Sequence, residues 1–189
     1  GLRRMQAGRC RPGLRALCQV AGMQLRDVTS GTLGFKIAPR LNAAGRLDDM
    51  TVGVRCLVTE NEDEALELAH QLDGLNRERR DIEARMRSQA EELVDAEHML
   101  EMEKSPYVVC LFREDWHEGL VGLVASRIKE RCHRPVIAFA PGRSGVLKGS
   151  GRSVPGFHLR DALAHVAGTQ PGLIERFGGH AMAAGLTIR

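Results

Sequence analysis

Residues 59–99, TENEDEALELAHQLDGLNRERRDIEARMRSQAEELVDAEHM, decide the fold because they form one long, charged helical pattern. Thr59 and Glu62 have the T-x-x-E spacing of a capping box, in which each side chain satisfies a backbone N–H of the first helical turn. Apolar residues then recur at spacings of three, four or seven and make one narrow stripe: Ala65, Leu68, Leu72, Leu75, Ile82, Met86, Ala90 and Leu93. The pattern predicts a helical strut between two functional halves. The alternative is a two-stranded coiled coil, which Arg79 within the stripe disfavours.

Charge is unevenly distributed along the 189 residues, whose formal net charge is +3. Residues 1–49 hold nine Lys and Arg against three Asp and Glu (+6), residues 50–106 hold seven against fifteen (−8), and residues 107–189 hold eleven against six (+5). Two basic ends around an acidic middle favour a polyanionic partner that contacts both ends. The alternative is ordinary solvated surface charge.

The composition allows one sizeable core or two small ones, since 43% of the residues are hydrophobic. Five cysteines without C-x-x-C spacing predict reduced packing residues in a cytoplasmic protein: Cys10, Cys18, Cys56, Cys110 and Cys132. The sequence has no signal-peptide pattern and no apolar run of about 18 residues, so we expect neither secretion nor membrane contact. The abrupt start at Gly1 and the strand-like residues 186–189 favour a fragment.

Upstream of the long helix, residues 38–47 read APRLNAAGRL, which is unlike ordinary loop or helix sequence. Small residues let the backbone approach a ligand closely, and Arg40 and Arg46 flank them. Because a planar guanidinium matches phosphate oxygens bidentately, this stretch predicts a phosphate clamp. The alternative is a structural salt bridge from Arg46 to Asp48 or Asp49.

After Pro106 the pattern becomes that of an α/β unit, with helices packed on a small sheet. β-Branched and aromatic runs predict strands over residues 107–112, 135–140 and 146–153. Apolar periodicity predicts helices over residues 119–131 and 159–166. Shorter helices are expected upstream, over residues 12–20, from Thr29 or Ser30 onward, and over residues 50–58.

Three stretches of this unit combine polar groups with glycines: residues 116–119 (WHEG), 148–153 (KGSGRS) and 176–185 (RFGGHAMAAG). In the first, His117 and backbone donors at a helix start can face an anion, while Trp116 is more typical of a core anchor. In the second, Arg152 and Ser153 suit a terminal phosphate, with a flexible hairpin end as the alternative.

The third stretch predicts a tight turn, made by Gly178 and Gly179, that presents His180 to a ligand at the start of a helix. His180 can donate to a phosphate oxygen, or it can be a structural histidine held by a carbonyl. No metal-ligand cluster, activated nucleophile, Walker A or G-x-G-x-x-G pattern stands out in the sequence. The residues therefore predict a phosphate-binding surface without catalytic groups or a metal site.

Taken together, PRLNAAGRLDDM, DWHEGLVGLVASRIKERCHRPVIAFA, KGSGRS and RFGGHAMAAG closely resemble the RecJ family of the DHH phosphoesterase superfamily, over nearly the whole chain. The resemblance implies a parent enzyme whose N-terminal domain binds two manganese or magnesium ions through aspartates and a D-H-H motif. This chain has neither. It is expected to comprise the end of the DHH domain (residues 1–58), the long connecting helix (59–105) and a DHH-associated α/β domain with a mixed sheet (106–189), truncated at its C-terminus.

The resemblance also implies the parent's activity, which is 5′-to-3′ degradation of single-stranded DNA in recombination and repair. A metal-bound hydroxide attacks the phosphodiester, and a groove between the two domains excludes duplex DNA. By analogy, Arg46, Arg152 and Ser153 hold the 5′-terminal phosphate, and Gly178, Gly179 and His180 hold a backbone phosphate. Arg40 and His117 are further expected substrate-binding residues.

The implied partners are single-stranded DNA, single-strand-binding protein and a helicase, and the implied state is a monomer. Because the metal ligands lie outside this chain, the fragment alone is expected not to hydrolyse DNA. Two other classes of function stay open. One is a DHH-superfamily phosphodiesterase that acts on short oligonucleotides or cyclic dinucleotides. The other is a non-catalytic module that binds nucleic acid or docks a protein.

Overall fold

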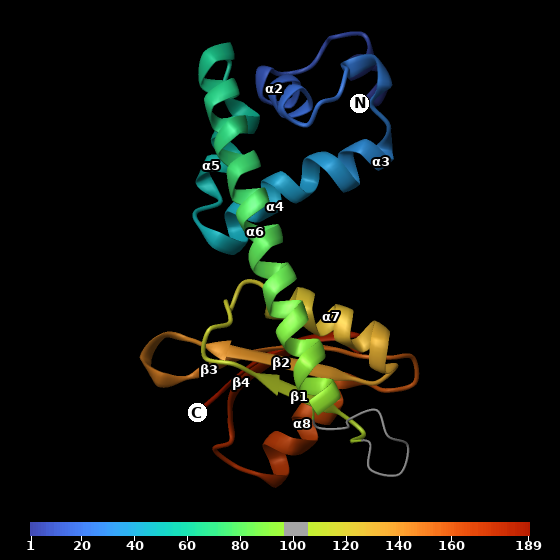
Figure 1. The fold of residues 1–189 in the computed structure, drawn as a ribbon, viewed down its shortest axis with the longest axis vertical. Coiled ribbons are helices and arrows are strands. Elements are labelled where there is room, and N and C mark those ends of the chain that lie inside the picture. The colour runs from blue at the N-terminus through green and yellow to red at the C-terminus, as the bar shows by residue number, and fades with distance from the viewer. Residues whose placement is uncertain (97–105) are drawn as a thin grey trace. The chain divides into compact units, whose positions relative to one another are not determined.

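The computed structural model describes residues 1–96 and 106–189, which divide into two compact units, residues 1–81 and 82–189. The long helix α6 (Glu62–Ala96) contains the boundary between these units (Figure 1). The predicted long helix is confirmed over these residues, and its predicted extension to Met99 lies outside the described residues. The division into residues 1–58, 59–105 and 106–189 stays a prediction.

Helix α6 is capped by Asn61. Its Oδ1 atom accepts hydrogen bonds from the backbone N–H groups of Asp63 at 2.9 Å and Glu64 at 3.0 Å. The hydroxyl of Thr59 instead accepts from the N–H of Asn61 and donates to the carboxylate of Glu64. The predicted capping box between Thr59 and Glu62 is therefore wrong, because Asn61 stands directly before the first helical turn and asparagine is at least as good a cap as threonine.

Residues 1–81 form a helical unit around one apolar core, to which Leu17, Ile37, Cys56 and Leu72 contribute. Its elements are α1 (Leu2–Gln6), α2 (Pro12–Val20), η1 (Leu25–Asp27), α3 (Ser30–Thr32), η2 (Leu33–Ile37), α4 (Ala38–Leu47), α5 (Thr51–Val58) and the part of α6 up to Asp81. The helices expected over residues 12–20 and 50–58 are confirmed. Thr29 is the cap of α3, and its hydroxyl accepts from the N–H of Thr32.

The expectation that residues 38–47 are unlike a helix is wrong, because they form α4. Pro39 has no N–H with which to close an α-helical bond to Phe35, and the preceding element, η2, is π-helical. Ala43 and Ala44 are fully buried. The small side chains that suggested a close ligand approach are thus used for packing of the helix.

Residues 82–189 contain one mixed five-stranded sheet in the order β1-β2-β3-β5-β4. Strand β1 is parallel to β2, and the remaining neighbours are antiparallel, so the predicted mixed sheet is confirmed. The elements are β1 (Val109–Phe112), α7 (Val121–Cys132), β2 (Val136–Pro141), η3 (Arg143–Gly145), β3 (Leu147–Arg152), α8 (Leu159–Thr169), β4 (Ile174–Gly179) and β5 (Ala183–Ile188).

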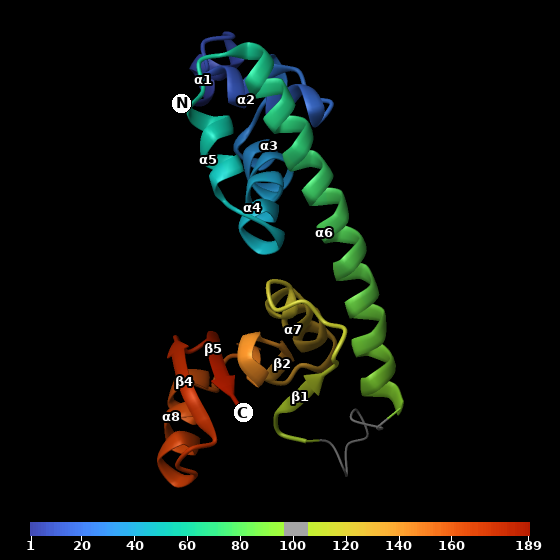
Figure 2. The same ribbon diagram turned by 90° about the vertical axis from the view of Figure 1, so that its left-hand side faces the viewer.

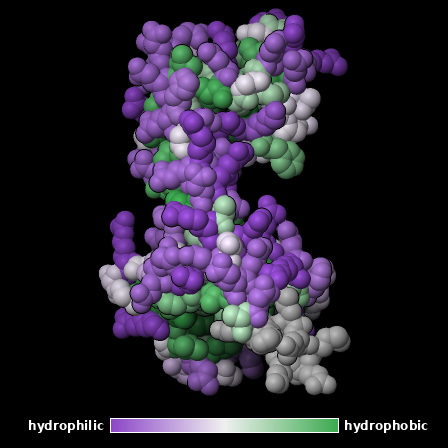
Figure 3. Space-filling view, in the orientation of Figure 1, coloured by the Kyte–Doolittle hydropathy of each residue, from purple (hydrophilic) through white to green (hydrophobic). Residues whose placement is uncertain are grey.

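Helices α7 and α8 lie on opposite faces of the sheet, α7 over β2 and β3 and α8 over β4 and β5 (Figures 1 and 2). Alternate residues of β3 face them: a β-carbon at Gly122 of α7 would meet Ser150 and Arg152, and one at Gly151 would meet Leu159 of α8. Each helix thus covers only part of its face. On the α8 side, the remainder is apolar and forms a cavity of about 300 Å³ that reaches Val108 and Cys110 beside α8 (Figure 3).

Three of the five cysteines are packing residues, as predicted. Cys18, Cys56 and Cys132 are buried, and burial raises the pKa of each thiol, which favours the uncharged form. Cys10 is half-buried and Cys110 is exposed. Within the described ranges, every helix is too short or too polar to span a bilayer.

Candidate nucleic-acid interface

A row of small residues crosses the face of the sheet on which α7 packs, from β3 beneath α7 to β5 and β4, which α7 leaves open. Ser150 on β3 lies opposite Gly185 on β5, and Gly185 lies opposite Gly178 on β4. Directly opposed residues point to the same face of a sheet, and Ser150 faces α7. Gly178 and Gly185 are both exposed. This small-residue row (Ser150, Gly185 and Gly178) leaves the backbone of two strands accessible to a ligand.

Arg152 extends this face by one strand step, since residues two apart on a strand share a face and lie about 6.8 Å apart. Arg152 is half-buried, and its Nη1 donates to the carbonyl of Gly151 at 2.9 Å. A β-carbon on Gly122 would lie 2.9 Å from Arg152 Nη2 and 3.5 Å from Ser150 Cβ. The glycine at residue 122 therefore makes room for a guanidinium beside a hydroxyl, which is a suitable pair for a phosphate group.

Ser153 lies one residue further, off this face. It is 1% exposed, and its hydroxyl donates to the carbonyl of Phe157 at 2.7 Å. Its backbone N–H donates to the carbonyl of Met182 at 3.0 Å. The polar groups of Ser153 thus hold the turn between β3 and α8, and its predicted contact with a phosphate stays a prediction.

Gly178, Gly179 and His180 form the end of β4 and the turn into β5. This corrects the expectation that a helix follows His180, because residues 183–188 form strand β5. Gly179 has φ of +145°, and a β-carbon there would lie 2.4 Å from the carbonyl oxygen of Ala183. The N–H of His180 donates to that same oxygen at 2.8 Å. Both His180 and Gly178 are exposed.

Trp116 anchors the segment before α7 in the core, as the sequence favoured. It is 4% exposed, and its Nε1 donates to Gln89 Oε1 at 2.9 Å. Gln89 in turn donates to Asp115, and this bond, together with one from Arg113, lowers the pKa of the Asp115 carboxyl. His117 Nδ1 accepts from the N–H of Gly119 at 3.1 Å. A neutral His117 ring therefore carries its proton on Nε2, which is a hydrogen-bond donor.

Comparison with known proteins identifies the family of this chain. Residues 104–189 match the DHHA1 domain family. Over the whole chain, the single-stranded-DNA-specific exonuclease RecJ of Dickeya dadantii (strain 3937) is 52% identical across 193 residues, which are 100% of this chain and 32% of the relative. The chain is a RecJ region that includes a DHHA1 domain.

Solved RecJ structures share the fold of this region. A crystal structure of RecJ from Thermus thermophilus in complex with Mg²⁺ matches with a TM-score of 0.81 and 32% identity, over 100% of this chain and 27% of that chain. A crystal structure of exonuclease RecJ bound to manganese matches with a TM-score of 0.80 and 33% identity, over 100% of this chain and 44% of that chain. The chain thus spans about a third of the length of its curated relative.

The two remaining predicted ligand residues of this RecJ region lie in the helical unit. Arg40 on α4 is engaged within the protein: Nε and Nη2 each contact Asp73 Oδ1 at 2.9 Å, and Nη1 donates to the carbonyl of Lys36 at 2.6 Å. Arg46 is half-buried in the last turn of α4. The structure thus places Arg152 on β3 and Gly178 and Gly179 on β4, the two strands that flank β5, with His180 in the turn after β4. Arg40 instead connects α4 to α6.

Histidine, cysteine, aspartate and glutamate side chains do not gather in groups of three or more among residues 1–96 and 106–189. The side chains of these described residues therefore form no protein-ligated site for the Mg²⁺ or Mn²⁺ of the solved structures. The side chains of this RecJ region can bind and orient phosphates.

Ser150 and Gly122 were not predicted as site residues. Ser150 could have been predicted, because residues 146–153 were expected to form a strand. Residues two apart on a strand face the same side, so Ser150 shares a face with Arg152, whereas Ser153 points to the other face. The proximity of Gly122 to Arg152 depends on how α7 packs on β3. The local sequence pattern cannot predict that contact.

Proposed function

We propose that this chain supplies the phosphate-binding part of a single-stranded-DNA-specific exonuclease. The supporting observation is that Arg152 and Ser150 both lie beside Gly122, on the same face of the sheet as Gly178. RecJ of Dickeya dadantii, which matches this chain over its whole length, is a single-stranded-DNA-specific exonuclease. A guanidinium, a hydroxyl and an accessible glycine backbone are all groups that bind phosphate oxygens.

In this proposal Arg152 and Ser150 hold the 5′-terminal phosphate, with the guanidinium forming two parallel hydrogen bonds and the hydroxyl a third. The exposed backbone at Gly178, with His180 beside it, contacts a phosphate further along the strand. Arg46, Ser153 and His117 remain predicted contributors. Arg40 is a weaker candidate, because Asp73 and the carbonyl of Lys36 engage its guanidinium.

The metal-dependent cleavage step belongs, in the same proposal, to parts of the parent enzyme outside this chain, which act in the cytoplasm with Mn²⁺ or Mg²⁺. Single-strand-binding protein and a helicase stay expected partners. Purified chain should release no nucleotides from a labelled single strand in MnCl₂ or MgCl₂. Metal-dependent cleavage by the wild-type chain that disappears in Arg152→Ala would contradict this assignment.

The test is fluorescence anisotropy of a labelled single strand and of a blunt duplex of equal length, at several salt concentrations. Preferential binding of the single strand, with affinity falling steeply as salt rises, supports phosphate contacts. Equal binding of both DNAs, or salt-independent binding, would contradict the proposal. Tighter binding of a cyclic dinucleotide than of any single strand would favour a phosphodiesterase of the same superfamily instead.

A further inference from the structure

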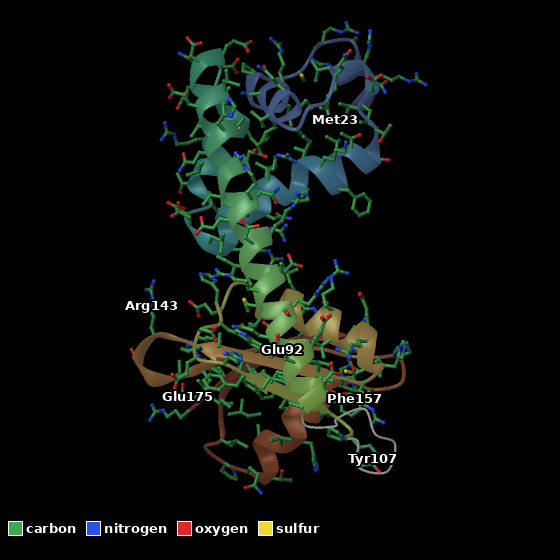
Figure 4. All side chains as sticks on the ribbon, in the orientation of Figure 1. Met23, Glu92, Tyr107, Arg143, Phe157 and Glu175 are labelled. Carbon is green, nitrogen blue, oxygen red and sulfur yellow. The ribbon has the colours of Figure 1, made fainter. Side chains whose placement is uncertain are left out.

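A second polar cleft lies on the α7 side of the same sheet, near the loop between β2 and β3. It has a volume of about 440 Å³, and its charged walls are Arg143, Lys148, Arg176, Glu118, Glu175 and Arg189. Figure 4 labels Arg143 and Glu175, which both lie toward the end of the sheet that carries this loop. We call this site the basic cleft.

The basic cleft contains cationic side chains that are not paired with a carboxylate. Glu175 pairs with Arg189, which leaves Glu118 as the other carboxylate of the lining. Lys148 Nζ donates to Thr187 Oγ1 at 3.0 Å, a neutral partner, so its charge stays uncompensated there. Among the described residues, Arg143 and Arg176 have no salt bridge. Three cations therefore face one unpaired carboxylate, and the cleft favours an anion.

Its position links this cleft to the proposed phosphate site. Lys148 is two residues from Ser150 on β3 and faces the same side, so the two side chains start about 6.8 Å apart. Thr187 lies opposite Lys148, and Arg176 lies opposite Thr187. The cationic side chains therefore extend from β3 to β4. Duplex DNA rises about 3.4 Å per nucleotide along each strand, and an extended single strand rises further, so the interval corresponds to one or two nucleotides.

We propose that the basic cleft binds a second phosphate of the same DNA strand, one or two nucleotides from the phosphate held by Arg152 and Ser150. This proposal rests on the proposed function, since it extends that site along the strand. It assigns Arg143 and Arg176 to backbone contacts that do not read sequence. Binding energy should then grow with oligonucleotide length until the cleft is filled.

The experiment compares the chain with Arg143→Ala/Arg176→Ala and with a control, Arg127→Ala/Arg160→Ala, which removes the same charge from exposed positions outside the cleft. Anisotropy gives the affinity for a labelled 5′-phosphorylated ten-nucleotide single strand, and competition gives that of a 5′-mononucleotide, which carries the first phosphate alone. We expect the cleft variant to bind the long strand about tenfold more weakly, with a smaller salt slope, and the mononucleotide unchanged.

An unchanged affinity for the long strand in the cleft variant, or an equal loss in the control, would overturn this proposal. So would an equal loss for the mononucleotide, because the cleft would then act on the first phosphate. Arg152→Ala separates the two proposals. If it weakens both ligands while the cleft variant weakens neither, the proposed function stands and the basic cleft does not. If Arg152→Ala changes nothing, the proposed function fails.

Discussion

Arg152 on β3 and Gly122 on α7 fit together so closely that a β-carbon at residue 122 would lie 2.9 Å from Arg152 Nη2. The nearest atom belongs to the far end of a flexible side chain, which can move without disturbing the sheet, and Ser150 Cβ at 3.5 Å is in ordinary van der Waals contact. Substitution of Gly122 therefore changes the position of the guanidinium and leaves the fold in place. This contact makes it possible to test the site without deleting any polar group.

Gly122→Ala should weaken binding of a 5′-phosphorylated single strand at least about fivefold, because the guanidinium is displaced from Ser150. Thermal stability should stay equal or rise slightly, since alanine is favoured over glycine in a helix by up to about 1 kcal/mol. Gly168→Ala on α8 is the matched control, because its β-carbon would enter open space. Unchanged DNA affinity in Gly122→Ala would show that the guanidinium position is irrelevant to binding.

The two serines of the KGSGRS stretch should separate binding from stability. Ser150→Ala removes a donor to a charged ligand and should weaken binding of the phosphorylated strand about tenfold, with the unfolding free energy unchanged. Ser153→Ala leaves the Phe157 carbonyl without this hydrogen bond. The free energy of unfolding in urea should fall by about 1–3 kcal/mol, with the preference for a 5′ phosphate intact. The reverse pattern would identify Ser153 as the ligand residue.

The adjacent glycines of β4 should also behave differently. Gly179→Ala should destabilise residues 82–189 by about 2–4 kcal/mol, because alanine is strained at φ of +145° and would collide with Ala183 and Ala184. Gly178→Ala meets nothing within 4 Å and should fold normally, yet bind single strands more weakly, since its β-carbon blocks the backbone. Denaturation curves and anisotropy on both variants check this. Normal binding by Gly178→Ala would remove residue 178 from the interface.

The start of α6 should be sensitive to acid. Hydrogen bonds from the Thr59 hydroxyl and from Arg55 lower the pKa of the Glu64 carboxyl. A lowered pKa in the folded state stabilises the protein above the usual glutamate pKa of about 4.3, and this contribution is lost as pH falls through the folded-state value. The stability difference between wild type and Glu64→Gln should therefore be largest near neutral pH and shrink below about pH 4.3. A difference independent of pH would contradict the assignment.

Sequence reasoning succeeded where one periodic pattern decided the structure. The stripe from Ala65 to Ala90 predicted α6, and the short apolar runs predicted β1, β2 and β3. It failed at β4 and at the first half of β5, because Gly178, Ala183 and Gly185 have low strand propensity and pairing with the neighbouring strands holds them in place. It failed at α4 as well, because the small residues of 38–47 were interpreted as allowing close approach to a ligand, whereas burial of Ala43 and Ala44 stabilises a helix.

For the site, the sequence indicated the correct stretches and only some of the side chains. Arg152 and Gly178 lie on the open face, but Ser153 is turned into the core and Arg40 is engaged with Asp73. Composition and spacing show which residues are able to bind phosphate. The alternation along β3 and the packing of α7 decide which of them face a ligand.

The most direct test of the phosphate-binding assignment is the affinity of this chain for one single-stranded oligonucleotide with a 5′ phosphate and with a 5′ hydroxyl, measured by anisotropy for wild type and Arg152→Ala. The account predicts that wild type binds the phosphorylated strand more tightly and that Arg152→Ala binds both strands equally. Equal affinities in wild type, or a phosphate preference that survives in Arg152→Ala, would contradict it.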